Sequence, residues 1–309
     1  MRASLLLVSP TRVFPPRSDG QLWVARKTCV KKARRMYEAY WKLSQKPFTQ
    51  RQDPARFYRS KSHQTALLRL KYALDNLTGP GLILGASGTG KTGLVKLLTA
   101  DHKDLQPLIH IVFPAISPDD LLRLVASEIS TFASVSPVIS TGNDGVLREI
   151  LTSLRRLSNN GHRTLLCFDD AHLLSEDAML QVVQPLLNLA ESEDHAMLAM
   201  LLVGQPVLSA KIRKLHQISE RIAVTTALTG FTANETSDYV RSSLLQSGGR
   251  SDIFSADALQ RLYEITAGNP RRINRLSDMA LLVGFAEQLG QITVGQIDSV
   301  SAELMPAAA

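Results

Sequence analysis

The chain has 309 residues, of which 44% are apolar, and a formal net charge of +7. This length and apolar content allow one large or two modest hydrophobic cores. No apolar run approaches the roughly 18–20 residues that a membrane helix requires, so we expect no integral membrane segment. The two cysteines, Cys29 and Cys167, are too few for a disulfide framework or a zinc site, which favours a reducing compartment and a cytoplasmic protein.

The positive charge is concentrated at the N-terminus. Residues 1–35 hold nine of the 35 Lys and Arg residues and one acidic residue, Asp19. The other 26 basic residues are offset by 27 acidic residues in 36–309, which leaves that part with a net charge of −1. Because DNA binding needs clustered Lys and Arg, the near-neutral remainder argues mildly against a DNA partner.

Residues 1–35 also lack sustained periodicity and contain three prolines. Coherent sequence begins near Met36, and we therefore favour an over-extended translation start for this extension. A disordered basic arm and a targeting segment are the alternatives, although the apolar run at residues 5–8 is short for a signal peptide.

Aromatic residues mark the next segment, which contains Tyr40-Trp41, Pro47-Phe48 and Phe57-Tyr58. A helix follows, and its apolar face includes Leu67 and Leu70. The segment lies just ahead of a nucleotide motif, so two interpretations of its aromatic side chains stay open. They pack around an adenine base, or they pin the N-terminal segment to the core.

The nucleotide motif is a phosphate-binding loop. Residues 85–92 match G-x-x-x-x-G-K-[ST], the loop of nucleotide triphosphatases. Its glycines let the backbone wrap a phosphate, its lysine reaches the β- and γ-phosphates, and its threonine hydroxyl binds Mg²⁺. A strand at 82–84 and a helix at 94–98 flank the loop, and a helix N-terminus favours anions. The residues predicted to bind ATP are Gly85, Ala86, Ser87, Gly88, Thr89, Gly90, Lys91 and Thr92.

Strands and helices alternate after the loop. A strand at 108–113 precedes a helix that begins with Ser117 as N-cap and Pro118 at the first helical position. A loop is expected near residues 134–145, and a second amphipathic helix at 147–157. This alternation predicts an α/β fold, in which helices cover both faces of a parallel sheet.

An apolar strand at 164–168 ends in two acids, Asp169 and Asp170. The carboxyl ends of parallel strands meet at one edge of a sheet, so these carboxylates are expected beside the phosphate loop. Asp169 would hold Mg²⁺, directly or through water, and Asp170 would polarise an attacking water. Alone, the pattern equally suits an Asp-capped turn before the helix that starts at Ser175; the upstream phosphate loop favours the nucleotide interpretation.

Two further polar residues lie at strand ends. A strand at 197–203 leads to Gln205, whose amide is placed to sense the γ-phosphate or the lytic water, although it also suits a turn. Arg221 precedes a strand at 222–228, where its guanidinium could project toward a neighbouring subunit. The basic residues between them, Lys211, Arg213 and Lys214, are interpreted as a solvated helix face that could form a local patch on DNA.

Beyond Gly230 the pattern is helical only. Candidate helices lie at 234–246, 255–267, 270–289 and 294–304. We therefore divide the chain into a basic extension, a P-loop ATPase core and a helical lid, with the bounds 1–35, 36–230 and 231–309.

Two arginines, Arg271 and Arg272, fall in the first turn of the third of these helices. Positive charge there opposes the helix macrodipole, so its presence needs another explanation. We expect at least one of the two arginines to have a functional role, and Arg271 could reach the phosphates of a bound nucleotide. A solvated first turn is the alternative.

Taken together, these motifs resemble the AAA+ ATPases of the ExeA/GspA type, the general secretion pathway protein A group. The match extends over roughly residues 37–305 and includes the aromatic opening, the phosphate loop, the strand ending in Asp169-Asp170, and the segments around Gln205, Arg221 and Arg271. The resemblance implies an AAA+ core with a helical lid, ATP and Mg²⁺ as cofactors, and a homo-oligomer.

The resemblance also implies roles for single residues. Lys91 and Thr92 would bind phosphates and Mg²⁺, and Asp169 would be the Walker B metal residue. Gln205 falls at the sensor-1 position. The lid arginine Arg271 would be the sensor-2 residue, and Arg221 a trans-acting arginine finger.

One residue departs from the family pattern. The family usually carries Asp-Glu where this chain has Asp169-Asp170, so the carboxylate that activates water lies one methylene farther back. Because general-base catalysis and positioning can each contribute orders of magnitude, we expect slow hydrolysis or an ATP-bound switch.

Two functions of different classes stay open. The first is an oligomeric ATPase that drives or regulates assembly of a secretion or envelope machine. It would act with a protein partner of that complex and reach the inner membrane through that partner. The second is an ATP-dependent DNA-binding regulator resembling the TnsC/TniB-type transposition ATPases, which share the motif set. A degenerate nucleotide-binding scaffold is a third interpretation, favoured only by Asp170.

Overall fold

The computed structural model describes residues 37–49, 54–76, 79–102, 105–112, 114–135, 142–190 and 197–304. The expectations for residues 1–35 lie outside these ranges, as do residues 136–141 of the expected loop.

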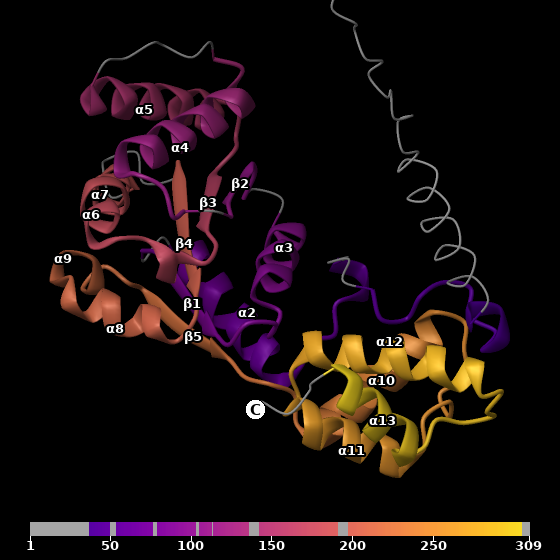
Figure 1. The fold of residues 1–309 in the computed structure, drawn as a ribbon. Coiled ribbons are helices and arrows are strands. Elements are labelled where there is room, and N and C mark those ends of the chain that lie inside the picture. Colours follow the sequence, from indigo (N-terminus) through magenta and orange to yellow (C-terminus); the bar gives the residue numbers. More distant parts are fainter. Residues whose placement is uncertain are drawn as a thin grey trace, which may run out of the picture.

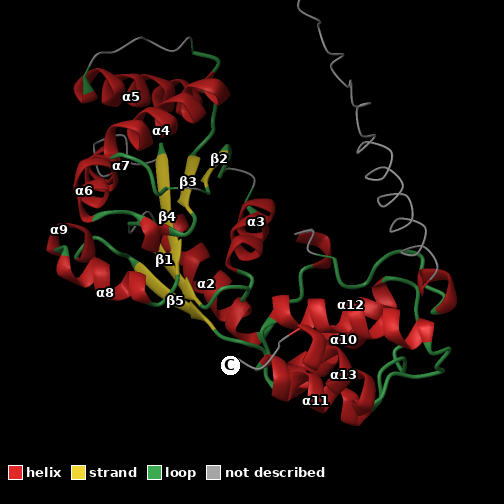
Figure 2. Cartoon of the chain, viewed as in Figure 1, coloured by secondary structure: helices red, strands yellow, loops and turns green. Residues whose placement is uncertain are grey.

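Within this part of the chain, five strands form one parallel sheet in the order β2-β3-β4-β1-β5 (Figures 1 and 2). The strands are β1 (Gly81–Gly85), β2 (Leu108–Ile111), β3 (Thr164–Phe168), β4 (Leu198–Gly204) and β5 (Val224–Leu228). The predicted α/β fold with a parallel sheet is confirmed. Since all strands run in one direction, β1 delivers the phosphate loop to the edge where its neighbours also end.

Both faces of the sheet are covered by helices, as its near-continuous apolar strands require. Alternate strand residues point to opposite faces. Leu82 and Phe168 contribute to the core on one face, while their neighbours Ile83 and Cys167 contribute to the core on the other. The first face is covered by α4 (Pro118–Ala133), α5 (Asn143–Asn159), α7 (Gln184–Ala190) and α8 (Val207–Lys214). The second is covered by α2 (Lys61–Asp75) and α3 (Lys91–Asp101).

Shorter elements complete the sheet region. They are the 3₁₀ turns η1 (Pro54–Arg56) and η2 (Ala171–Leu173), the single turn α6 (Glu176–Ala178), the π-helical η3 (Met179–Val183) and α9 (His216–Ser219). Ser175 caps α6 by accepting a hydrogen bond from the Ala178 backbone at 3.0 Å. The helix predicted to start at Ser175 therefore begins there.

The segment between α4 and α5 differs from the prediction. As expected, Ser117 caps α4 by accepting a hydrogen bond from the Asp120 backbone N–H. The helix ends at Ala133, and Ser134 follows it in the left-handed conformation (φ 52°). α5 begins at Asn143, inside the range expected to be a loop. The small and polar residues that indicated a loop instead form the extended N-cap, Gly142, and the first helical turn.

A second region consists of helices only and lies beside the sheet region (Figure 1). Its helices are α10 (Ala233–Gln246), α11 (Ala256–Thr266), α12 (Pro270–Ala286) and α13 (Val294–Leu304). α12 ends before the predicted Leu289, because Gln288 rather than Gly290 adopts the left-handed conformation (φ 55°). We call this group the helical region.

The N-terminal segment 37–49 packs against the helical region and not against the sheet (Figure 1). Tyr37, Trp41 and Phe48 are buried in the helical core. The Trp41 indole donates to the Leu281 carbonyl at 2.9 Å. The division predicted from the sequence did not assign this segment to the lid, since its contacts join residues about 240 positions apart.

Candidate nucleotide-binding site

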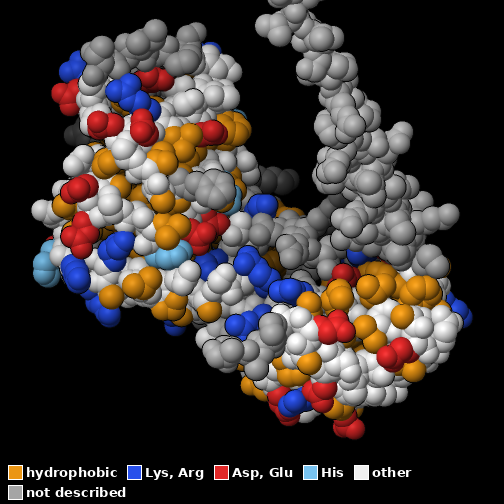
Figure 3. Space-filling view, in the orientation of Figure 1, with side chains coloured by type: hydrophobic (Ala, Val, Ile, Leu, Met, Phe, Trp, Pro, Cys, Tyr) orange, Lys and Arg blue, Asp and Glu red, His pale blue; other side chains and the backbone are white. Residues whose placement is uncertain are grey.

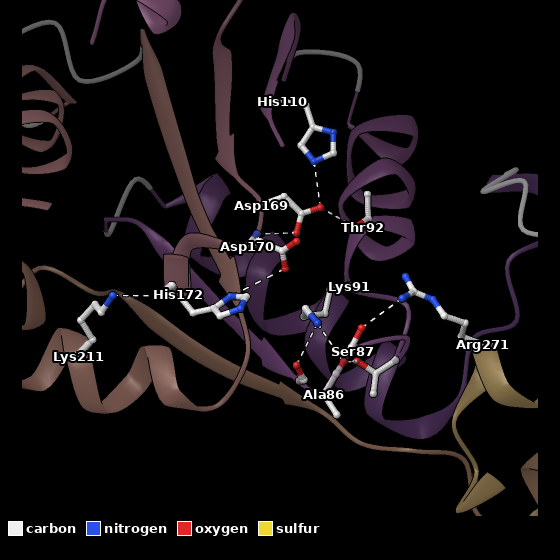
Figure 4. Close-up of polar contacts among 12 residues, drawn as sticks. Ala86, Ser87, Lys91, Thr92, His110, Asp169, Asp170, His172, Lys211 and Arg271 are labelled. Carbon is white, nitrogen blue, oxygen red and sulfur yellow. Dashed lines mark hydrogen bonds and ion pairs between the residues drawn. The ribbon is translucent and has the colours of Figure 1, made fainter. Parts of the chain in front are cut away.

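The phosphate loop connects the end of β1 to the start of α3, as its motif predicts. Gly88 and Gly90 adopt left-handed backbone conformations (φ 86° and 94°), which favour glycine. The Lys91 ammonium donates to the carbonyls of Gly85 and Ala86, each at 3.0 Å (Figure 4). The lysine is therefore buried within the loop that carries it.

His63, to which no sequence motif pointed, contacts the backbone of the phosphate loop. His63, on α2, lies 3.0 Å through Nε2 from the Thr89 carbonyl and 2.6 Å through Nδ1 from the Ser60 hydroxyl. A Cβ at Gly90 would approach its Nε2 to 2.9 Å, so the glycine permits this contact. Burial lowers the pKa of the His63 ring, against a smaller opposing effect of its bond to Thr89.

Asp169 follows β3 and is held by three donors (Figure 4). Its Oδ2 accepts from the Thr92 hydroxyl at 2.6 Å and faces His110 Nε2 at 3.1 Å. Its Oδ1 accepts from the Asp170 backbone N–H at 3.0 Å. Burial raises the pKa of the Asp169 carboxyl, but the bonds to His110 and Thr92 outweigh it and leave that pKa below its usual value.

His110 contacts Asp169 although no sequence motif pointed to it. It lies on β2, where it pairs in register with Cys167 of β3, two residues before Asp169. Strand order, which a single sequence does not reveal, brings the two together.

The residues proposed to hold Mg²⁺ fit that ion. Hard cations such as Mg²⁺ prefer oxygen ligands. The Thr92 hydroxyl and an Asp169 oxygen lie within hydrogen-bonding distance, so one ion could contact both. The lowered pKa keeps the carboxylate charged.

Asp170 lies one residue farther on and lines the same cavity as Lys91. Its backbone is left-handed (φ 51°), and its side chain is 48% exposed. Burial lowers the pKa of the Lys91 ammonium, Asp170 and Asp169 oppose that shift, and Arg271 adds to it. Asp169, Asp170 and Arg271 are therefore all close enough to Lys91 to affect the pKa of its ammonium.

The helical region contacts the loop through Ser87. Arg271 Nη1 donates to the Ser87 hydroxyl at 3.2 Å (Figure 4). Asn269 Nδ2 donates to the Ser87 carbonyl at 2.8 Å. Asn269 also caps α12 by accepting from the backbone N–H groups of Arg271 and Arg272. The first turn of α12 is therefore not merely solvated: one of its two arginines reaches the loop.

A cavity of about 340 Å³ opens between the loop and the helical region. Phe57 and Tyr58 line it, together with Tyr239 and Asn274, which are joined by a hydrogen bond of 2.5 Å. The aromatic residues of this segment thus fall into two groups. Trp41 and Phe48 pack in the helical core, while the later aromatic pair faces the space beside the phosphate loop.

Gln205 and Arg221 lie at opposite ends of the parallel strands: Gln205 at the carboxyl ends and Arg221 at the amino ends. Gln205 directly follows β4, at the edge that carries the loop, although it is not among the residues that line the cavity. Arg221 precedes Val224, which pairs with Gly81 at the beginning of β1. Arg221 therefore lies at the end of the sheet away from its own loop, where it bonds to Asn188 at 2.5 Å.

Basic side chains gather in two places on the face shown in Figure 3: over α8 and α9, and where the two regions meet. In α8, Arg213 and Lys214 are exposed. Lys211 is committed to the fold, because its ammonium donates to the carbonyls of His172 at 2.9 Å and Leu174 at 2.5 Å. Lys211 therefore does not extend freely into solvent with Arg213 and Lys214, as the interpretation of a solvated helix face expected.

Among the described residues, no helix combines the length and apolarity that crossing a bilayer would require.

Comparison with known proteins places the chain in a family context. Residues 75–212 match the family model described as an AAA domain. The chain is 30% identical over 272 residues to general secretion pathway protein A of Aeromonas hydrophila, a match that covers 87% of this chain and 48% of that protein. The chain thus spans about half the length of the curated relative it matches.

Solved structures with low sequence identity share the fold. Cdc6p of Pyrobaculum aerophilum superimposes with a TM-score of 0.64 at 16% identity, covering 88% of this chain and 72% of that one. The Orc1 protein of Aeropyrum pernix, solved in complex with DNA, gives 0.61 at 15% identity, with 81% and 67% covered. The RuvB branch migration motor of Thermotoga maritima gives 0.51 at 18% identity, with 80% and 73% covered. The AAA domain match and the secretion relative confirm the resemblance predicted from the motifs: residues 75–212 form an AAA domain, and the chain is related over 87% of its length to general secretion pathway protein A.

Proposed function

We propose that the chain binds ATP with Mg²⁺ in this cavity and hydrolyses it, and that this cycle drives or regulates assembly of a secretion or envelope machine. The observation that carries the proposal is the convergence of separate elements at one sheet edge. These groups are the phosphate loop after β1, Thr92 on α3, Asp169 and Asp170 after β3, and Arg271 on α12, and they surround one space.

Binding would use groups that are already placed. Lys91 would exchange its two carbonyl acceptors for phosphate oxygens, which are stronger partners for a charged donor. Arg271 would add a second cation from the lid. Mg²⁺, when bound, neutralises phosphate charge, and Thr92 and Asp169 are the residues that would hold it.

Hydrolysis would depend on Asp170 and on residues around it. Asp170 lines the cavity and would orient or deprotonate the attacking water. Gln205 follows the neighbouring strand and would sense the γ-phosphate from the same edge. Because the Asp170 carboxylate is shorter than the glutamate usual in the resembled family, turnover is expected to be slow.

The proposal includes a homo-oligomer. Arg221 lies at the edge of the sheet away from its own phosphate loop, so it could complete only the site of a neighbouring subunit. The secretion role follows from the name of the relative, general secretion pathway protein A. The protein partner of that machine would receive the movement of the lid.

Turnover and assembly of the full chain test the proposal against the DNA-binding alternative. ATP hydrolysis and particle mass would be measured with Mg²⁺ at about 0.1 M salt, with and without duplex DNA. We expect Mg²⁺-dependent turnover and ATP-dependent oligomers that DNA leaves unchanged. Stimulation by DNA with filament formation would contradict the secretion role, and ATP binding without turnover would leave only a scaffold.

The length of the carboxylate at position 170 offers a direct check on hydrolysis. In Asp170→Glu, the carboxylate reaches one methylene farther into the cavity, and we expect faster hydrolysis, up to about tenfold. Initial rates at saturating ATP would measure it. An unchanged or lower rate would rule out carboxylate length as the limit on turnover.

A further inference from the structure

His172, in η2, has a buried polar side chain close to the site that the proposed mechanism does not use. Its side chain is 11% exposed. Its Nδ1 is buried and has no hydrogen-bond partner among the described residues. The Oδ1 of Asp170 lies 3.9 Å from this nitrogen (Figure 4). That distance is too long for a hydrogen bond, although it is close enough for an attraction between charges.

The two side chains differ in how firmly they are held. Lys211 ties the turn of His172 in place by donating to the carbonyls of His172 and Leu174. The Asp170 side chain is 48% exposed, and within the described part of the chain its carboxylate oxygens make no hydrogen bond. Because the His172 backbone is held and its imidazole is buried, rotation of the exposed Asp170 side chain is the simpler way to bring the two together.

Closing this gap would be favourable. A buried nitrogen without a partner costs free energy, and a bond to a charged acceptor recovers more than a neutral one. In the tautomer with its proton on Nδ1, His172 would donate to one Asp170 oxygen and leave the other facing the cavity. Such a bond would fix the direction of a carboxylate that is one methylene shorter than usual for the resembled family.

We propose that His172 is a positioning residue that orients Asp170 for the attack of water on ATP. The inference rests on the proposed function, because it assigns His172 a part in hydrolysis. It does not make His172 a catalytic residue, since the imidazole does not line the cavity. His172 acts through Asp170.

A double-mutant cycle tests this dependence. Removing the donor in His172→Ala should lower kcat about tenfold while the Kd for ATP stays within about twofold, since a small misplacement of a reacting group costs rate. His172→Asn, which keeps a donor near Nδ1, should recover part of the loss. In an Asp170→Asn background, with residual hydrolysis followed in single-turnover experiments, His172→Ala should have no further effect.

His162 provides the matched control, because it is an exposed histidine on the turn after α5. His162→Ala should leave both kcat and Kd unchanged. An unchanged kcat in His172→Ala would overturn the proposal. So would an equal loss in the wild-type and Asp170→Asn backgrounds, because His172 would then act without Asp170.

A spectroscopic measurement separates failure of this inference from failure of the proposed function. In full-length protein labelled with ¹⁵N-histidine, Asp170→Asn should shift the Nδ1 resonance of His172 and leave that of His162 in place. His172→Asn would identify the resonance by removing it. A protein without ATP turnover contradicts the proposed function, whereas an unmoved His172 resonance contradicts the pairing, whatever the turnover.

Discussion

The two sides of the nucleotide site are built differently. On the sheet side, Lys91 and Asp169 are 7% and 6% exposed, and their bonds connect α3, β2 and β3. On the side of the helical region, Arg271 is exposed and meets the loop through a single bond to Ser87, with Asn269 beside it.

This difference indicates a division of labour. Buried, mutually bonded groups are already positioned, so we expect the sheet side to bind phosphate and metal by exchanging bonds, without moving whole elements. An exposed contact between two regions is easily broken and remade. We therefore expect the helical region to respond to a bound nucleotide and the sheet side to hold it.

The largest loss of activity is expected from a change on the sheet side. Asp169→Asn keeps the shape of the side chain but removes the charge proposed to hold Mg²⁺. Metal ions contribute several kcal/mol to such reactions, so kcat/KM should fall about 100-fold or more.

Hydrolysis rates across a Mg²⁺ titration would measure this loss. Asp101→Asn is the control, because Asp101 ends α3 outside the cavity and pairs with Lys71 at 3.0 Å. A wild-type rate in Asp169→Asn would show that the metal is not held there.

A smaller effect is expected on the lid side. Arg271→Ala removes an exposed cation that reaches Ser87, and its loss should weaken ATP binding about tenfold, at the lower end for a charged contact. Its neighbour in the same helical turn, Arg272→Ala, should change binding by less than about twofold. Fluorescence titration with a labelled ATP analogue distinguishes the two; equal effects would remove Arg271 from the site.

The smallest effect concerns the support beneath the loop. Burial depresses the pKa of His63 in the folded protein below the value of about 6.5 in the unfolded chain. Between those two values the unfolded state binds more protons. The free energy of unfolding should therefore fall as pH drops from about 6.5, by at most about 1.4 kcal/mol per pH unit.

Urea unfolding at several pH values, with His63→Gln beside the wild type, measures this contribution. The variant should show a shallower loss of stability on acidification, because it has no imidazole to protonate. Identical slopes would mean that His63 does not titrate differently in the two states.

Local patterns explain what could be predicted from the sequence. The phosphate loop, the strand that ends at Asp169 and the cap at Ser117 are each encoded within a few neighbouring residues, so periodicity and capping chemistry suffice. The alternation of strands and helices then predicts the parallel sheet.

Contacts between distant segments could not be predicted in this way. His110 reaches Asp169 only because β2 pairs with β3, and Arg271 reaches Ser87 across 184 residues. The segment 37–49 is assigned to the ATPase core from its position in the sequence, yet its buried aromatic residues pack in the helical core. Each depends on tertiary packing, which overrides local pattern.

The most direct test of the central claim, that the loop of residues 85–92 binds ATP, is calorimetric titration of Lys91→Ala against Lys96→Ala. Both lysines lie on α3, but only Lys91 lines the cavity. Charge-assisted bonds contribute about 1.5–3 kcal/mol each, so loss of the Lys91 ammonium should raise the Kd for ATP about 100-fold. The Kd of Lys96→Ala should match the wild type. Equal ATP affinity in the two variants would contradict the account.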